Sequence, residues 1–275
     1  MGSIVWVASY PESGARWLSM FLANLISDSQ TQCGEHDRNM IVPAENSKKL
    51  YQPFFNRPLS EIPLRELAEM RPTIHRELAK RANGFLFLRT HNAAIRHFGV
   101  PTITPEATSA AIYVVRNPMD IAASYGAATG RPIDRTIAHM AQTGRVLGKS
   151  TSRSYEIVGS WSENVKSWTM DIRGRILCIQ FEHMLEDPHK LFSEVVHFLE
   201  MKATPEQISR ATENSIVGVL QAYSKSQSRP KTRLNSLEML HAGAANQGKK
   251  LLKTQQMATI AALHRDQMKR FGYWR

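Results

Sequence analysis

The segment VWVASYPESGARWLSMFLANLI, residues 5–26, decides the fold of this chain. It passes from a short apolar run, through a turn that contains Pro11 and Gly14, into a mostly apolar stretch over residues 16–26. A short apolar run is typical of a buried strand, and the later stretch fits a helix packed against a sheet. The first N–H groups of such a helix have no partner inside it and bind anions. The segment therefore predicts a strand, an anion-binding loop and a helix.

Short apolar runs recur along the chain and alternate with helical patterns. Strands are predicted at residues 4–9, 85–88, 110–115 and 176–181, and helices at residues 119–125, 133–140, 156–172, 191–199 and 257–271. This alternation favours an α/β fold with a parallel sheet flanked by helices. The length of 275 residues favours one domain over residues 1–275, with two small domains as the alternative.

Three stretches depart from the alternation. Residues 32–72 are rich in Pro, Asn and charge, and residues 129–154 are mixed, so both are predicted to be substrate-facing insertions. Residues 224–253 are basic and weakly patterned. This third stretch is either a solvated surface loop or a flap that closes over a polyanionic ligand.

Composition limits the classes of partner. The net charge of +11 suggests nucleic acid, an anionic membrane surface or a small anionic ligand. The chain has no zinc-finger spacing, no RNA-recognition motif and no basic zipper, which argues against nucleic acid. We expect neither a signal peptide nor a membrane-spanning helix, because no basic start precedes a long apolar run. Cys33 and Cys178 fit no metal-site spacing, which favours a cytoplasmic protein.

Polar residues follow three of the predicted strands. Ser13 follows the first strand, Arg89 and His91 the second, and Arg116 the third, with Ser124 in the next helix. Taken one at a time, such residues more often have a structural role, in a turn, in packing or in capping a helix, than a functional one. In parallel sheets, however, ligands bind beyond the carboxyl ends of the strands. The ordered set therefore indicates a site for phosphate binding and proton transfer.

A second phosphate-loop candidate is set aside. GRVLGKS, residues 144–150, resembles the pattern GxxxxGK[ST], but it is one residue too short between the glycines. It also follows a predicted helix instead of a strand.

Five stretches in order resemble the cytosolic sulfotransferase family, including its bacterial branch. SYPESGARW (residues 9–17) resembles the 5′-phosphosulfate loop, and RTH (residues 89–91) resembles Lys-Thr-His. YVVRNPMDIAASY (residues 113–125) is close to the 3′-phosphate motif. GSWSENVKSW (residues 159–168) resembles a helix of the family, and FEHMLEDP (residues 181–188) resembles a family stretch that contains Tyr-Glu-Asp.

This resemblance implies a P-loop-like α/β fold, the sulfotransferase fold. It implies transfer of a sulfuryl group from 3′-phosphoadenosine-5′-phosphosulfate (PAPS) to a hydroxyl or amine of a small-molecule acceptor. The resemblance implies no metal. It names neither the acceptor nor the oligomeric state.

Site residues follow by matching position. His91 is the expected general base, and Arg89 stands where the family has a Lys that contacts the sulfuryl group. Arg116 and Ser124 are expected to bind the 3′-phosphate. Trp17 is expected to stack on adenine, with a core position on its helix as the alternative. The expected donor-binding set is Pro11, Glu12, Ser13, Gly14, Ala15, Arg16, Trp17, Arg116, Ser124, Phe181 and Lys249.

Glu12 departs from the family pattern, which has Lys at this position. Two like charges 4 Å apart repel by about 4 kcal/mol at an effective dielectric of about 20. Either Glu12 turns away or pairs with a basic neighbour, or Arg16 supplies the missing charge as a catalytic cation. The alternatives are a non-catalytic adenosine-phosphate binder and a transferase that uses a different donor.

The C-terminal loop is the second departure. LHAGAANQGKK, residues 240–250, lacks the Arg-Lys pair of the family loop. Lys249 and Lys250 are the candidates to replace it.

Overall fold

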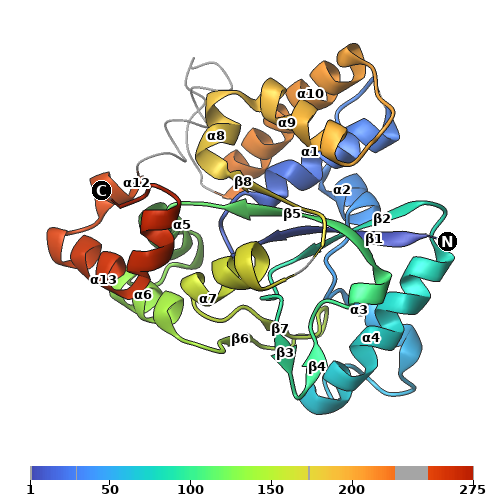
Figure 1. Cartoon of the computed structure of the whole chain (residues 1–275), viewed down its shortest axis with the longest axis horizontal. Helices are drawn as coiled ribbons and strands as arrows, with labels where there is room; N and C mark the ends of the chain where they lie inside the picture. Colours follow the sequence, from blue (N-terminus) through green and yellow to red (C-terminus); the bar gives the residue numbers. More distant parts are fainter. Residues whose placement is uncertain (1, 29, 173, 227–246, 275) are drawn as a thin grey trace. The chain divides into compact units, whose positions relative to one another are not determined.

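The sheet confirms the predicted α/β fold. The structure, a computed structural model, describes residues 2–28, 30–172, 174–226 and 247–274 (Figure 1). Four parallel strands, in the order β2-β1-β5-β8, are flanked by helices. They are β1 (Ser3–Ser9), β2 (Phe85–Thr90), β5 (Thr108–Val115) and β8 (Ile176–Gln180). In β1 and β2, Val5 pairs with Phe87 and Val7 with Arg89.

The chain forms two compact units, each made of three segments. Unit 1 comprises residues 1–10, 43–113 and 139–178, and unit 2 comprises residues 11–42, 114–138 and 179–275.

In unit 1, helices pack on the strands. α4 (Leu64–Arg81) contacts β1 and β2. α7 (Trp161–Lys166) runs into a π turn, η3 (Ser167–Asp171), and packs on β5. There the Tyr113 hydroxyl donates to Asn164 Oδ1 at 2.9 Å. The smaller elements are α3 (Lys48–Tyr51), η1 (Gln52–Phe54), β3 (Arg96–His97), β4 (Val100–Pro101), η2 (Pro105–Ala107), β6 (Val146–Leu147) and β7 (Glu156–Ile157).

The prediction of a helix over residues 156–172 is wrong at its start. Glu156 and Ile157 form β7, which pairs antiparallel with β6. The helix begins only after Ser160, whose hydroxyl accepts the N–H of Glu163 while the Glu163 carboxylate accepts the N–H of Ser160. This reciprocal cap is a strong helix start. Phe181, predicted to end a strand, is the first residue of a helix.

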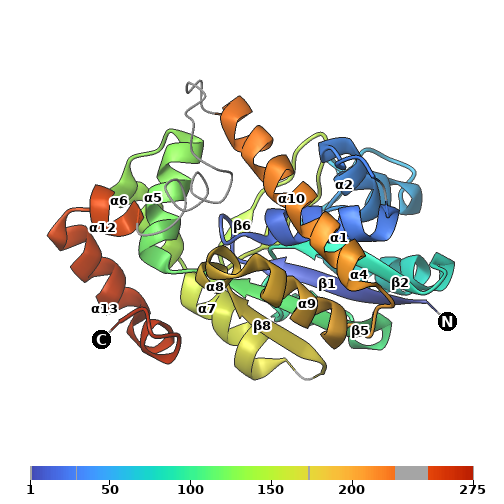
Figure 2. The same ribbon diagram turned by 90° about the horizontal axis from the view of Figure 1, so that it is seen from above.

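Unit 2 consists mainly of helices. α1 (Ala15–Ser27), α9 (Pro188–Phe198) and α10 (Pro205–Ser226) pack together, and Figure 2 shows α10 lying along α1. Phe21 of α1 stacks on Phe192 of α9, with ring centroids 4.2 Å apart. The remaining helices are α2 (Glu35–Ile41), α5 (Pro118–Thr129), α6 (Ile133–Ala141), α8 (Phe181–Glu186), α12 (Gln247–Leu251) and α13 (Thr254–Arg270).

Both predicted insertions contain regular elements. Residues 32–72 include α2, α3, η1 and the start of α4, and residues 129–154 include α6 and β6. Most of the predicted basic flap, residues 227–246, lies outside the described residues.

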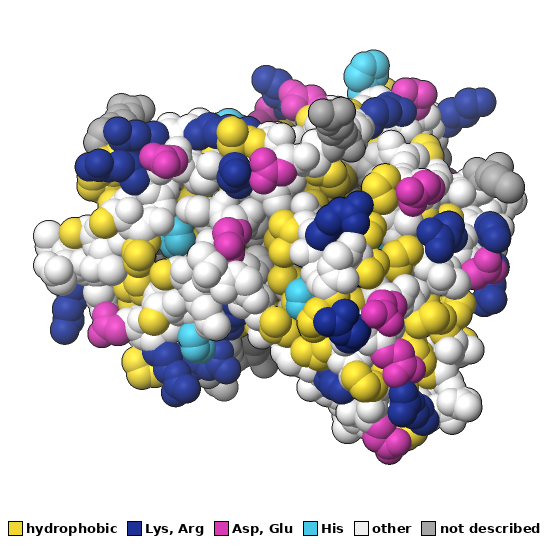
Figure 3. Space-filling view, turned by 60° about the horizontal axis from the view of Figure 1, so that its bottom comes forward, with side chains coloured by type: hydrophobic (Ala, Val, Ile, Leu, Met, Phe, Trp, Pro, Cys, Tyr) yellow, Lys and Arg dark blue, Asp and Glu magenta, His cyan; other side chains and the backbone are white. Residues whose placement is uncertain are grey.

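The charged surface is mixed on the face drawn in Figure 3. Lys and Arg side chains are spread over this face with Asp and Glu between them. Throughout the described ranges, no helix is both long and apolar enough to cross a membrane.

Candidate active site

The loop between β1 and α1 buries a hydroxyl group. Ser13 is 1% exposed, and its Oγ has no hydrogen-bond partner among the described residues. Gly14 caps α1 with φ = 106°, a conformation that side chains rarely adopt. A Cβ on Gly14 would also overlap the Phe181 ring. The loop is thus held close to Phe181 with a buried donor at the start of a helix, as an anion site requires.

Arg116 is fixed beside this loop. Its Nη1 donates to the Glu12 carbonyl oxygen at 2.7 Å, and its guanidinium carbon lies 4.6 Å from the centre of the Phe181 ring. Burial lowers the pKa of Arg116, an effect opposed by the carboxylates of Asp120 and Glu182. Because guanidinium stays protonated in proteins, Arg116 places a buried positive charge against the loop.

The Glu12 side chain is directed toward α5. Its carboxylate accepts a hydrogen bond from Ser124 Oγ at 3.1 Å, and its backbone has φ = 64°. Ser124 is the residue expected to bind the 3′-phosphate. Glu12 therefore pairs with a neighbouring hydroxyl of the expected donor site.

Arg16 forms an ion pair with Glu35 of α2, and both side chains are half exposed. An exposed pair of this kind contributes about 0–1 kcal/mol to stability. Arg16 is thus paired with a neighbouring carboxylate, and its role as a catalytic cation stays a prediction.

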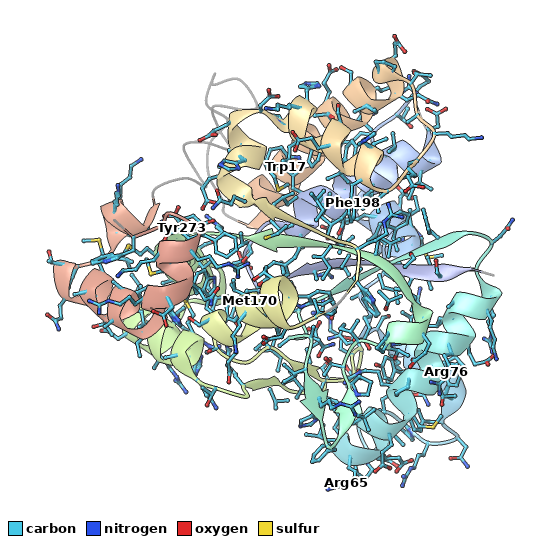
Figure 4. All side chains as sticks on the ribbon, in the orientation of Figure 1. Trp17, Arg65, Arg76, Met170, Phe198 and Tyr273 are labelled. Atoms are coloured by element: carbon cyan, nitrogen blue, oxygen red, sulfur yellow. The ribbon has the colours of Figure 1, made fainter. Side chains whose placement is uncertain are left out.

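Trp17 is almost fully buried in the helical core of unit 2. It is 2% exposed, and its Nε1 donates to Ser215 Oγ at 2.9 Å. Its ring meets the edges of Phe181 and Phe192, with centroids 6.4 and 5.6 Å away, and Figure 4 labels it on α1. These contacts give Trp17 a packing role; its stacking on adenine stays a prediction. Pro11 and Ala15, on either side of Ser13, are also buried.

Lys249 lies on α12, which packs against α5. The N–H of Gly248 donates to Asp120 Oδ1 at 2.7 Å, and a Cβ on Gly248 would lie 2.6 Å from Met119 Cβ. The Lys249 side chain is exposed. Residues 240–246 of the predicted C-terminal loop lie outside the described residues.

In unit 1, His91 has a defined tautomer. Its Nδ1 lies 2.8 Å from the Ser9 carbonyl oxygen. A carbonyl oxygen only accepts, so Nδ1 carries the hydrogen and Nε2 is the acceptor in the neutral ring. Arg89 Nη1 lies 3.4 Å from Nε2. The ring therefore presents a proton acceptor beside a positive charge.

Two further residues hold the backbone of His91, and the sequence did not single them out. The N–H of His91 donates to Glu156 Oε1 at 2.8 Å, and its carbonyl oxygen accepts from Asn164 Nδ2 at 3.0 Å. Asn164 lies in the segment GSWSENVKSW, which was recognised only as a helix. Glu156 was assigned to that helix, so its role as a hydrogen-bond acceptor was missed.

The rejected phosphate-loop candidate has structural contacts. Lys149 Nζ donates to the carbonyl oxygens of Ser60 and Ile62, at 3.0 and 2.6 Å. Lys149 thus links its own loop to the loop that contains Ser60 and Ile62. Elsewhere in the described ranges, no group of His, Cys, Asp and Glu is arranged to hold a metal ion.

The fold is α/β, with a buried hydroxyl in the loop before α1 and a histidine directly after β2. The family model of the sulfotransferase domain matches residues 3–272. The chain belongs to the sulfotransferase family and is an enzyme of sulfuryl transfer. No curated protein sequence matches it.

Solved structures share the fold at low sequence identity. Mouse sulfotransferase SULT7A1 complexed with PAP is 16% identical, with a TM-score of 0.55 over 97% of this chain and 84% of that chain. Retinol dehydratase in complex with androsterone and the inactive cofactor PAP has the same identity and TM-score, over 97% of this chain and 80% of that chain. The sulfotransferase domain of the Synechococcus PCC 7002 olefin synthase is 16% identical, with a TM-score of 0.50 over 99% of this chain and 95% of that domain.

Proposed function

We propose that this enzyme transfers the sulfuryl group of PAPS to a hydroxyl or amine of a small molecule. The buried Ser13 hydroxyl, which has no partner in the described part of the chain, carries the assignment of an anionic donor. An unpaired buried donor is costly unless a ligand satisfies it. Two of the similar structures contain PAP, the product that PAPS leaves after transfer, which supports an adenosine donor.

We assign the donor-binding residues to the two ends of PAPS. Ser13 and the first N–H groups of α1 would donate to the phosphosulfate, and Arg116 would form charge-assisted hydrogen bonds with phosphate oxygens. Ser124 would donate to the 3′-phosphate, which would then replace the Glu12 carboxylate as its acceptor. We include Lys249 as a further cation for the phosphates.

His91 would take the proton from the acceptor. As the acceptor oxygen or nitrogen bonds to sulfur, its proton passes to Nε2 and the bond between sulfur and the bridging oxygen breaks. The electron pair leaves with the phosphate of PAP. Arg89 would stabilise the negative charge on the sulfuryl oxygens. Catalysis then depends on positioning and electrostatics.

The proposal also covers the class of acceptor and the place where it binds. The similar retinol dehydratase was crystallised with androsterone, an apolar small molecule. We propose that residues 32–72 and 129–154 line the acceptor site. We also propose that the enzyme works in the cytoplasm, where Cys33 and Cys178, which are not joined in a disulfide, stay reduced.

Calorimetric binding of PAP tests the donor assignment. Wild type should bind PAP, and Ser13→Ala should weaken binding by about 10- to 100-fold, because a hydrogen bond to a charged group is lost. Glu12→Lys should tighten binding, and Glu12→Gln, its uncharged control, should tighten it less. If wild type fails to bind PAP while Glu12→Lys binds it, PAPS is not the natural donor.

A matched pair of variants tests Arg16. Arg16→Ala should weaken PAP binding, whereas Glu35→Gln should strengthen it by releasing the same guanidinium. Equal affinities in both variants and wild type would exclude Arg16 from the donor site.

His91→Ala separates catalysis from binding. Activity should fall by at least 100-fold, since general-base catalysis contributes about 10²- to 10⁴-fold. PAP affinity should be retained, and unchanged activity would exclude His91 as the base.

A further inference from the structure

A carboxylate outside the expected site is buried at the centre of a polar cluster in unit 1. Glu45 is 1% exposed. Its Oε1 accepts from Arg71 Nε at 3.3 Å and from His75 Nε2 at 3.1 Å, and also from the Tyr51 hydroxyl. Its Oε2 accepts from Asn92 Nδ2 at 3.1 Å. We call these five residues the Glu45 cluster.

The charges in the cluster are defined by its contacts. Burial alone would raise the pKa of Glu45, but Arg71 and the donor groups of His75 and Tyr51 lower it to about 2. Burial lowers the pKa of His75, so this ring is neutral at pH 7. Because a carboxylate only accepts, His75 Nε2 carries the hydrogen, and Nδ1 accepts from Thr104 Oγ1 at 2.8 Å. The cluster therefore holds one anion and one cation with their hydrogen bonds satisfied.

Such a cluster is a poor source of stability. Removing two charges from water costs several kcal/mol per ion, and apolar replacements are often as stable. Its hydrogen bonds do fix geometry, because each group has one position that satisfies its neighbours. The hydrogen bonds that leave the cluster show which part of the structure the cluster positions.

The Glu45 cluster is hydrogen-bonded to the chain on both sides of His91. Before His91, the Glu45 N–H donates to the Arg89 carbonyl oxygen at 2.8 Å, and the Arg89 N–H donates to the Pro43 carbonyl oxygen at 2.9 Å. After His91, the fully buried Asn92 binds Glu45 through Nδ2 and accepts the Ile157 N–H at its Oδ1, at 2.8 Å. The segment that carries Arg89 and His91 is thus anchored to Glu45 at two points.

α4 supports the carboxylate from the other side. It supplies Arg71 and His75, and it is the helix on which Arg65 and Arg76 are labelled in Figure 4. The His75 ring also packs edge-on against Trp6 of β1, with centroids 5.0 Å apart. The cluster therefore connects a helix and two strands to the turn at His91.

We propose that Glu45 is a positioning residue for sulfuryl transfer: its buried carboxylate, through Asn92, and its backbone N–H, through the Arg89 carbonyl oxygen, set where the His91 ring and the Arg89 side chain lie. The inference rests on the proposed role of His91. A misplacement of about 1 Å in a reacting group costs up to about 100-fold in rate. The link therefore acts on kcat and leaves donor affinity unchanged.

Asn92→Ala and Glu45→Gln test the link, with Thr104→Val as the matched control. Asn92→Ala cuts the contact to the turn and keeps the bonds of Glu45 to Arg71 and His75. Thr104→Val instead removes a hydrogen bond at the far end of the same cluster. The readouts are kcat and the KM for PAPS, normalised to the concentration of PAP-binding sites, so that only folded molecules are counted.

We expect Asn92→Ala and Glu45→Gln each to lower kcat at least tenfold with the KM for PAPS within twofold of wild type. Thr104→Val should keep kcat within twofold. The double variant should be no slower than the slower single variant, because both changes cut one connection. A kcat within twofold of wild type in Asn92→Ala, or multiplied effects in the double variant, would overturn the proposal.

His91→Ala, measured alongside, separates this inference from the proposed function. If His91→Ala abolishes activity while Asn92→Ala does not lower kcat, the positioning role is wrong and the role of His91 stands. If His91→Ala stays active, the proposed base is wrong and the positioning role falls with it.

Discussion

At the scale of single residues, the loop at the start of α1 depends on Gly14. We expect Gly14→Ala to lower the free energy of unfolding by about 1–3 kcal/mol, because the backbone at φ = 106° becomes strained and the new Cβ meets Phe181. Gly84→Ala is the control, since Gly84 has φ = 90° but nothing within 4 Å of its Cβ position. Urea unfolding measures both variants, and equal losses would show that contact with Phe181 is unimportant.

Single residues at strand ends could be selected from the sequence as site candidates, and the role of each stays a prediction. Ser13, His91 and Arg116 could be selected because a parallel sheet presents its ligand groups where strands end. The hydrogen bonds that orient these residues could not be predicted from the sequence. Glu156 and Glu45 act through contacts with residues 65 and 47 positions away, and no local pattern reports such a pairing.

At the scale of elements, the start of α7 is set by its cap. Ser160→Ala should destabilise the protein by about 1 kcal/mol, because the first turn loses a hydrogen-bond acceptor. Ser160→Thr should restore most of that stability. Thermal unfolding of the three proteins checks the order, and a Ser160→Ala protein as stable as wild type would remove the cap as the reason why α7 starts here.

The elements also show why the helix prediction failed over residues 156–172. Ile157 continues the apolar periodicity of the helix, but the backbone of Glu156 and Ile157 pairs with Leu147 and Val146 instead. Gly159, with φ = 62°, then separates the strand from the cap. Tertiary pairing outweighed local preference at this boundary.

At the scale of the whole molecule, acid should weaken the fold in two stages. His264 has a pKa of about 4, against an ordinary value of 6.5, because it is buried. The unfolded chain therefore binds this proton first, and stability falls as the pH drops from 6.5 to 4. Glu45, with a pKa of about 2 against 4.5, should cause a second loss below pH 4.5.

The free energy of urea unfolding, measured from pH 7 to pH 3, checks both stages. Each group can account for at most about 3 kcal/mol when fully titrated. His264→Phe should flatten the upper stage, and Glu45→Gln should flatten the lower one. A profile of His264→Phe parallel to that of wild type between pH 6.5 and 4 would assign the upper stage to other groups.

The way the chain alternates between the two compact units limits where it can be truncated or recombined. Six segments of chain alternate between the units, so the backbone passes from one to the other five times. No continuous stretch of the gene encodes either unit alone. A truncation, an insertion or a fusion point anywhere between residues 11 and 178 would divide both units at once, so we expect this part of the chain to be exchanged between proteins only as a whole.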